Sequence, residues 1–185
     1  MQNLQKLSDE ALAAHLQSGQ KSAFEALIDR YQEKICRYAK RFFADKEDVE
    51  DLVQDVFLKV YVNINSYDKN QRFSPWIYRI AHNTFVNKIA WKSVRKLVSI
   101  DTDEVFTLSL ASPENVERES IRREEREQME RHLKSLDSKY REPLVLFFYE
   151  ELSYEEIADI LKIPINTVGI RILRGKNKLK KILTQ

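Results

Sequence analysis

The chain has 185 residues, enough for one or two small domains that each bury a core. Its net charge is only +2, so any affinity for nucleic acid must come from where the charges lie. Three glycines and four prolines in a Leu-, Ile-, Glu- and Lys-rich chain predict an all-α fold. The single cysteine, Cys36, excludes an internal disulfide and is interpreted as a small core residue. Because no apolar run approaches a membrane span and no signal-peptide pattern is present, we expect a soluble, cytoplasmic protein without membrane insertion.

The N-terminal part of the chain is predicted to form two helices. The first lies within residues 1–18, where Ser8 is a suitable N-cap and Gly19 a stop. Ser22 and Glu25 form a capping box that opens the second helix. Its apolar side chains follow helical spacing and are therefore predicted core residues: Phe24, Leu27, Ile28, Tyr31, Ile35, Tyr38, Ala39 and Phe42.

A third helix, predicted to begin near Lys46, has one acidic face. Its apolar stripe runs from Val49 to Ile64. The other face carries Glu47, Asp48, Glu50, Asp51, Gln54 and Asp55. Acidic residues in the first turn stabilise a helix through its dipole, but this reason does not extend as far as Asp55. A basic protein partner is the second interpretation of this face.

Residues 63–72 are polar and are predicted to form a loop that leads into a long helix over 73–96. Ser74 is the predicted N-cap and Pro75 stands at the first helical position. This helix contains no Asp or Glu, and its basic residues are Arg79, Lys88, Lys92, Arg95 and Lys96. Aromatic, amide and imidazole groups lie between them: Trp76, Tyr78, His82, Asn83, Asn87 and Trp91. This mixture suits unpaired nucleic acid, whereas a core helix with a basic outer face is the structural alternative.

The middle of the chain lacks clear periodicity. Residues 97–117 are predicted to be a flexible linker between two domains, 1–96 and 118–185. The segment 120–131 is highly charged and mixed in sign, and is interpreted as a solvated helix. The first domain would be a bundle of three helices with the N-terminal piece packed on it.

The C-terminal part contains a predicted helix-turn-helix. Asp137 or Ser138 can cap one helix, and a capping box at 153–156 opens a short second helix that ends at Leu161. Pro164 breaks the chain, and Asn166 is the predicted cap of a basic final helix that reaches about residue 183. Such a motif projects the start of its second helix into a major groove, although a solvated basic helix is the alternative.

Three blocks of this sequence, in this order, resemble the bacterial extracytoplasmic-function sigma factors, group 4 of the sigma-70 family. They are EDVEDLVQDVFLKVY at 47–61, FSPWIYRIAHN at 73–83 and YREPLVLFFYEELSYEEIADILKIPINTV at 140–168. The resemblance covers nearly everything from Ser22 to Leu183. It implies a region 2-like domain at 1–96, a linker at 97–117 and a region 4-like domain at 118–185.

The resemblance also implies a role for each surface. The acidic helix would bind the clamp helices of core RNA polymerase through Asp48, Asp51, Leu52, Gln54 and Asp55. The loop and the helix after it would capture and hold the −10 strand through Tyr67, Arg72, Phe73, Trp76, Arg79, Asn83, Lys88, Lys92 and Arg95. The final helix would bind −35 duplex through Asn166, Thr167, Arg171, Arg174 and Lys178. Its domain would also contact the polymerase flap tip, and an anti-sigma protein is a further implied partner.

One position departs from the family pattern. Where these proteins usually have a basic residue after Thr-Val, this chain has Gly169. A groove-facing cation is thereby lost, and glycine costs a helix roughly 1 kcal/mol relative to alanine. The departure predicts either an unusual −35 sequence or greater use of phosphate contacts.

Two other classes of function explain less of the sequence. A stand-alone helix-turn-helix regulator would bind duplex without polymerase, but it leaves the features at 45–55 and 73–96 unexplained. An enzyme is disfavoured because His15, His82 and His132 lie in separate elements without metal-ligand spacing, and because no phosphate loop or nucleophile motif is present. We therefore expect no catalytic residue, metal or cofactor.

Overall fold

The computed structural model describes residues 4–43, 45–98, 128–129, 131–133 and 135–183. Every regular element in these ranges is helical, which confirms the all-α prediction. The chain divides into two compact units, one built around Met1–Val98 and the other around the residues that follow. The predicted linker lies outside the described residues, apart from 97 and 98 at the end of a helix, and so does most of the solvated helix predicted at 120–131.

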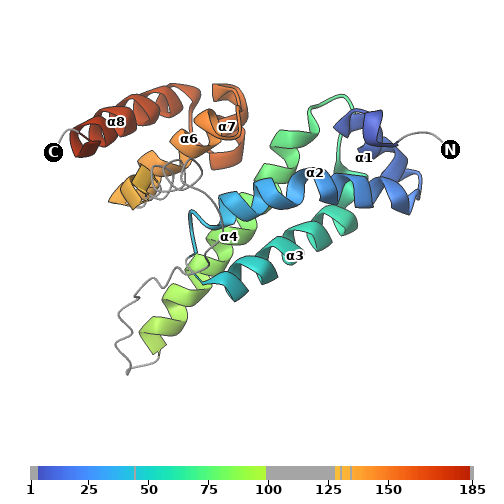
Figure 1. Cartoon of the computed structure of the whole chain (residues 1–185), viewed down its shortest axis with the longest axis horizontal. Coiled ribbons are helices and arrows are strands. Elements are labelled where there is room, and N and C mark those ends of the chain that lie inside the picture. Colours follow the sequence, from blue (N-terminus) through green and yellow to red (C-terminus); the bar gives the residue numbers. More distant parts are fainter. Residues whose placement is uncertain (1–3, 44, 99–127, 130, 134, 184–185) are drawn as a thin grey trace, which may run out of the picture. The chain divides into compact units, whose positions relative to one another are not determined.

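The first unit is a bundle of helices around an aromatic core. Its elements are η1 (Leu4–Lys6), α1 (Asp9–Gln17), α2 (Lys21–Ala39), α3 (Lys46–Asn63), η2 (Ile64–Ser66) and α4 (Phe73–Val98). α2 packs against α1 and α3, and α3 packs against α4 (Figure 1). The largest fully buried side chains of this unit include Tyr31, Tyr38 and Phe85, in agreement with the apolar stripes of the sequence, and also Phe73 and Tyr78, which the sequence analysis had placed among groups suited to nucleic acid.

The second unit contains α6 (Ser138–Phe148), α7 (Tyr154–Leu161) and α8 (Ile165–Leu183). α6 and α8 approach closely at Gly175, where a Cβ atom would lie 2.7 Å from Leu144 Cδ1 and 3.3 Å from the carbonyl oxygen of Tyr140. Lys162, just after α7, has a left-handed backbone with φ 54°, and the N–H of Ile163 donates to Ala158 at 3.1 Å. This helix ending turns the chain sharply toward α8, so the predicted helix-turn-helix is confirmed.

Two predicted caps are confirmed by their hydrogen bonds. Ser8 Oγ accepts from the N–H of Ala11 at 3.2 Å at the start of α1. Ser153 and Glu156 form the reciprocal pair of a capping box, with Ser153 N–H donating to the carboxylate at 2.7 Å and Glu156 N–H donating to Ser153 Oγ at 3.2 Å. These bonds satisfy backbone donors that a helix start leaves without partners.

Three other predicted helix starts are wrong by one or two residues. α2 begins at Lys21 with Gln20 as its N-cap, so Ser22 lies within the first turn and does not cap it. α8 begins at Ile165, because the Pro164 carbonyl already accepts from the N–H groups of the first turn, and Asn166 is therefore helical. α4 begins at Phe73, one residue before its predicted cap, Ser74.

Candidate functional site

The outward face of α3 carries most of the acidic residues singled out from the sequence. Asp51, Gln54 and Asp55 are exposed, and Asp55 forms an ion pair with Lys59 at 3.3 Å. Asp48 is more enclosed, since its side chain is 23% exposed and lies 3.9 Å from Lys88 Nζ of α4. Leu52 is in the core and 4% exposed, so its side chain is not on this face.

An apolar groove that the sequence analysis missed adjoins the acidic face. It has a volume of about 510 Å³ and lies between α2 and α3. Its lining residues are Phe24, Ile28, Gln32, Val53, Gln54, Phe57, Leu58 and Tyr61. Leu58 and Val62 follow Asp51 and Asp55 at a spacing of two helical turns and are 62% and 73% exposed. This spacing can be seen in the sequence, and it indicates that Leu58 and Val62 lie on the same side of α3 as the acidic residues.

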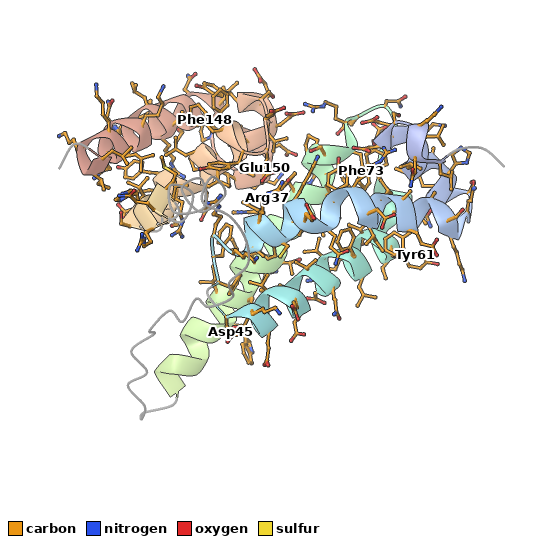
Figure 2. The ribbon with its side chains drawn as sticks, in the orientation of Figure 1. Arg37, Asp45, Tyr61, Phe73, Phe148 and Glu150 are labelled. Carbon is orange, nitrogen blue, oxygen red and sulfur yellow. The ribbon has the colours of Figure 1, made fainter. Side chains whose placement is uncertain are left out.

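Three aromatic residues predicted to contact DNA form a buried cluster beneath the loop between η2 and α4. Tyr67, Phe73 and Trp76 are 4%, 0% and 8% exposed. Their ring centroids lie between 5.3 and 5.6 Å apart, and Figure 2 shows Phe73 within the first unit. Burial raises the pKa of Tyr67 to about 12. These rings therefore support the loop from below, and their faces are not open to solvent.

Helix α1 supports the same loop from the side. The Nε2 of Gln17 donates to the carbonyl oxygens of Ile64 at 2.9 Å and Tyr67 at 2.8 Å. The carboxylate of Glu10 accepts from the N–H of Phe73, the first residue of α4, at 3.2 Å. Partial burial raises the pKa of Glu10, but hydrogen bonds from the N–H groups of Glu10 and Phe73 outweigh it and leave that pKa below its usual value. Neither residue was predicted, because the contacts join positions 47 to 63 residues apart.

Four further predicted −10 residues have described side chains, and these lie on or near the surface of the loop and α4. Arg72 and Asn83 are exposed, and Arg79 is half-buried. Lys88 is also half-buried and lies 5.6 Å from the centroid of the Trp91 ring. The side chains of Lys92 and Arg95 lie outside the described part of the structure. Basic and amide groups therefore lie beside the loop, while the aromatic groups are mostly in the core.

Helix α8 presents its predicted DNA-contacting residues unequally. Asn166, Arg174 and Lys178 are exposed, although Lys178 Nζ lies 5.5 Å from the Tyr140 ring centroid. Thr167 and Arg171 are half-buried. Burial raises the pKa of Glu142 on α6, and the positive charges of Arg141 and Arg171 partly oppose this rise. Arg171 is thus engaged electrostatically with its own domain, whereas Arg174 is open to a partner.

Gly169 lies on a flank of α8 that faces Tyr154 of α7. A Cβ atom built there would be 3.4 Å from Tyr154 Cε2, which is ordinary contact. The glycine is therefore not at the outermost line of the helix. A longer side chain at this position would have to pass along the Tyr154 ring to reach solvent.

The second unit also carries an apolar groove, with a volume of about 410 Å³. Residues of α6 and α8 and of the segment before α6 form it: Met129, Leu133, Leu144, Phe148, Tyr149, Lys176, Leu179, Lys180 and Leu183. Phe148, which is 51% exposed, lies at the end of α6 (Figure 2). Lysines edge the groove, so an apolar partner with acidic flanks would fit it best.

The described residues form neither a metal site nor a membrane-spanning helix. No group of three or more histidine, cysteine, aspartate or glutamate side chains is placed there to hold a metal ion. His82 is instead buried, and its Nδ1 lies 3.2 Å from the Tyr38 hydroxyl. None of the helices described is both long enough and apolar enough to cross a bilayer.

The chain is similar to known proteins over most of its length. The family described as "Sigma-70 region 2" matches residues 27–95, and "Sigma-70, region 4" matches residues 126–179. The chain is 33% identical to the ECF RNA polymerase sigma factor SigW of Bacillus subtilis, over 91% of this chain and 92% of SigW. It is 33% identical to the ECF RNA polymerase sigma-E factor of Escherichia coli, over 95% of this chain and 94% of that factor. The solved complex of CnrH with the cytosolic domain of CnrY contains a similar chain, with a TM-score of 0.69, 27% identity and coverage of 95% and 97%.

A helical unit matched by region 2, followed by a helix-turn-helix unit matched by region 4, defines a transcription-initiation factor. The chain belongs to the extracytoplasmic-function sigma factors of the sigma-70 family. Sigma factors bind core RNA polymerase and direct it to promoters; they are not enzymes.

Proposed function

We propose that this chain binds core RNA polymerase in the cytoplasm, recognises −35 duplex through α8 and opens the −10 element at the loop before α4. The observation that carries the proposal is the pairing of a region 2 unit that has an exposed acidic face with a region 4 unit that has a basic recognition helix. The polymerase supplies the catalysis. The chain supplies promoter choice and the first step of strand separation, and it needs no cofactor.

Polymerase docking is assigned to α3 and the groove beside it. Asp51, Gln54 and Asp55 are exposed, and Leu58 extends the same face as an apolar anchor. Charges of one sign steer association, whereas a desolvated apolar anchor supplies most of the affinity. The clamp helices are the basic partner we propose for this surface. Asp48 contributes less directly, because Lys88 already lies close to it.

Capture of the −10 strand is assigned to the loop from Tyr67 to Arg72 and to the exposed side of α4. Flipping a base out of its stack costs a few kcal/mol, so the receiving surface must be rigid before the base arrives. The buried rings of Tyr67, Phe73 and Trp76 and the bonds from Gln17 give this rigidity. Arg72, Arg79 and Asn83 then contact the strand, and Lys88, Lys92 and Arg95 hold phosphates further along the helix.

Two protein partners are assigned to the apolar surfaces. The flap tip of the polymerase is proposed to occupy the groove between α6 and α8, which combines apolar walls with lysines at its edge. A separate inhibitor, an anti-sigma protein, is proposed to compete for the docking surfaces. The complex of the relative CnrH with a domain of CnrY is the precedent for a protein bound to such a chain.

The experiment that tests the proposal is retention of bacterial core RNA polymerase on the purified, immobilised chain. Reversal of one exposed charge by Asp51→Arg should reduce retention about tenfold, since it places a like charge against the clamp helices. Glu33→Arg is the matched control: it makes the same reversal on α2, where the glutamate side chain is 90% exposed. It should leave retention unchanged.

Three results would contradict the proposal. Equal loss with both variants would show a general effect of net charge, and normal retention of Asp51→Arg would remove α3 as the docking face. If a folded wild-type chain retained no polymerase yet bound specific duplex by itself, it would act as a stand-alone helix-turn-helix regulator.

A further inference from the structure

Two aliphatic side chains lie on the outward side of α8, where a DNA-binding helix is usually polar. Val168, Ile172 and Gly175 are buried and define the inward side of the helix. At 100° per residue, the positions on the opposite side include Asn166, Ile170, Leu173, Asn177 and Lys181. Ile170 is 49% and Leu173 61% exposed. Ile170 therefore stands near the centre of the exposed face and Leu173 to one side of it, with an asparagine one turn before and one turn after the pair.

The surroundings of this pair indicate an anionic partner with apolar groups on it. α8 contains no acidic residue, and the exposed side chains next to the pair include Arg174 and Lys176. An exposed aliphatic patch of this kind is stabilised when a partner covers it. A partner made only of phosphates would satisfy the cations and leave Ile170 and Leu173 in water.

The major groove of DNA offers the required combination. Phosphates line its edges, and the C5-methyl of thymine is an apolar group presented within it. The asparagine side chains complement this, because an amide can pair with the N6 and N7 groups of adenine. We propose that Ile170 and Leu173 read thymine methyl groups, so that the −35 element of this sigma factor carries A·T pairs at the positions they face. The inference rests on the proposed binding of −35 duplex by α8.

Gly169 is consistent with such reading. Isoleucine and leucine are much shorter than arginine, so the backbone of α8 must come closer to the base edges for their methyl groups to make contact. The glycine immediately before Ile170 lies on the flank that faces Tyr154 and adds no side chain beside the pair.

The test uses holoenzyme reconstituted from core RNA polymerase and the full chain. Promoter-length duplexes with a randomised upstream window are selected for binding, and the enriched sequence is then altered one base at a time from thymine to deoxyuridine. This change removes only the methyl group and keeps the base pair. At one or two positions the affinity should fall about fourfold, the factor expected for burying one methyl-sized group.

Variants of the chain identify which side chain contacts each thymine methyl group. Ile170→Ala and Leu173→Ala should each bind the thymine and deoxyuridine duplexes equally at one of these positions. Ile165→Ala is the matched control, since this isoleucine of α8 is 41% exposed but is not among the outward positions. It should keep the full discrimination.

Each remaining outcome overturns a distinct claim. If deoxyuridine is tolerated at every position, or if both alanine variants still discriminate, the methyl-reading inference is wrong. If Ile170→Ala instead weakens retention of core polymerase, the apolar pair is a protein contact. If polymerase binds the chain but no upstream sequence is enriched, the −35 assignment itself fails, and the inference fails with it.

Discussion

Gln17 on α1 and Tyr67 in the loop before α4 are joined by a hydrogen bond, in which the side-chain Nε2 of Gln17 donates to the carbonyl oxygen of Tyr67 at 2.8 Å. The same nitrogen donates to Ile64 at 2.9 Å, so one amide holds both ends of the η2 turn. The loop that we assign to the −10 strand is thus fixed by a helix outside the part matched by region 2. α1 is therefore a structural part of the proposed strand-capture site.

Replacement of this amide should loosen the loop. Gln17→Leu keeps the size of the side chain but removes both donated bonds, which should lower the stability of the first unit by about 1–2 kcal/mol. Faster hydrogen exchange of the loop backbone would report the loosening directly. Holoenzyme carrying the variant should also bind a single-stranded −10 oligonucleotide more weakly, while its retention of polymerase stays normal.

A control separates this effect from a general one. Gln5→Leu makes the same change at an exposed glutamine of η1 and should alter none of the three readouts. If Gln17→Leu unfolds no part of the loop and leaves strand binding intact, α1 has no positioning role. If Arg72→Ala also leaves strand binding intact, the assignment of this loop to the −10 strand is at fault.

The sequence predicted those features of the fold that depend on local patterns of residues. Helical spacing of apolar residues located α2, α3 and α4, because an amphipathic helix has to turn one side to the core. It could not show that Tyr67, Phe73 and Trp76 pack on one another. The sequence around an aromatic residue looks the same whether its ring stacks on a nucleic-acid base or on neighbouring side chains. Burial decided between these alternatives.

The contacts made by Gln17 and Glu10 could not be predicted from the sequence, for a different reason. Both residues lie on a short helix where polar side chains need no explanation, and their partners are backbone atoms far along the chain. A backbone carbonyl carries no residue-specific signal. The confirmed capping box at Ser153 and Glu156 was predictable because its two partners are three residues apart.

The buried His82 should make the first unit sensitive to mild acid. Burial lowers its pKa to about 4 from an unfolded value of 6.5. Between these values the unfolded chain binds more protons, so stability is full above about pH 6.5 and falls as the pH drops toward 4, by at most about 1.4 kcal/mol per pH unit. Urea unfolding of wild type and His82→Gln at several pH values should show a shallower dependence in the variant. Equal slopes in the two proteins would contradict this account.

Replacement of Gly175 by a larger residue should be destabilising. Its absent Cβ would lie 2.7 Å from Leu144 Cδ1, and Leu144 is 3% exposed and has little room to move. Gly175→Val should therefore destabilise the second unit by about 1–3 kcal/mol, the usual cost of overpacking. Hydrogen exchange of α6 and α8 in the full chain measures this change. Gly169→Val is the matched control, because its Cβ would meet Tyr154 at 3.4 Å, and comparable loss of protection in both variants would remove close approach as the cause.

The cations of α8 should contribute unequally to the salt dependence of promoter binding. Arg174 is exposed, whereas Arg171 is half-buried and its charge partly opposes the rise that burial causes in the pKa of Glu142. Each cation that neutralises one phosphate adds about 0.9 to the slope of log affinity against log salt concentration. Arg174→Ala in holoenzyme should therefore lower the slope by about 1, and Arg171→Ala should lower it less. Lys139→Ala on α6, where the lysine lies 3.7 Å from Asp137, should leave it unchanged. If Arg171→Ala gave the larger change, Arg171 would turn from Glu142 to a phosphate when DNA binds, and the half-buried arrangement would belong to the free protein alone.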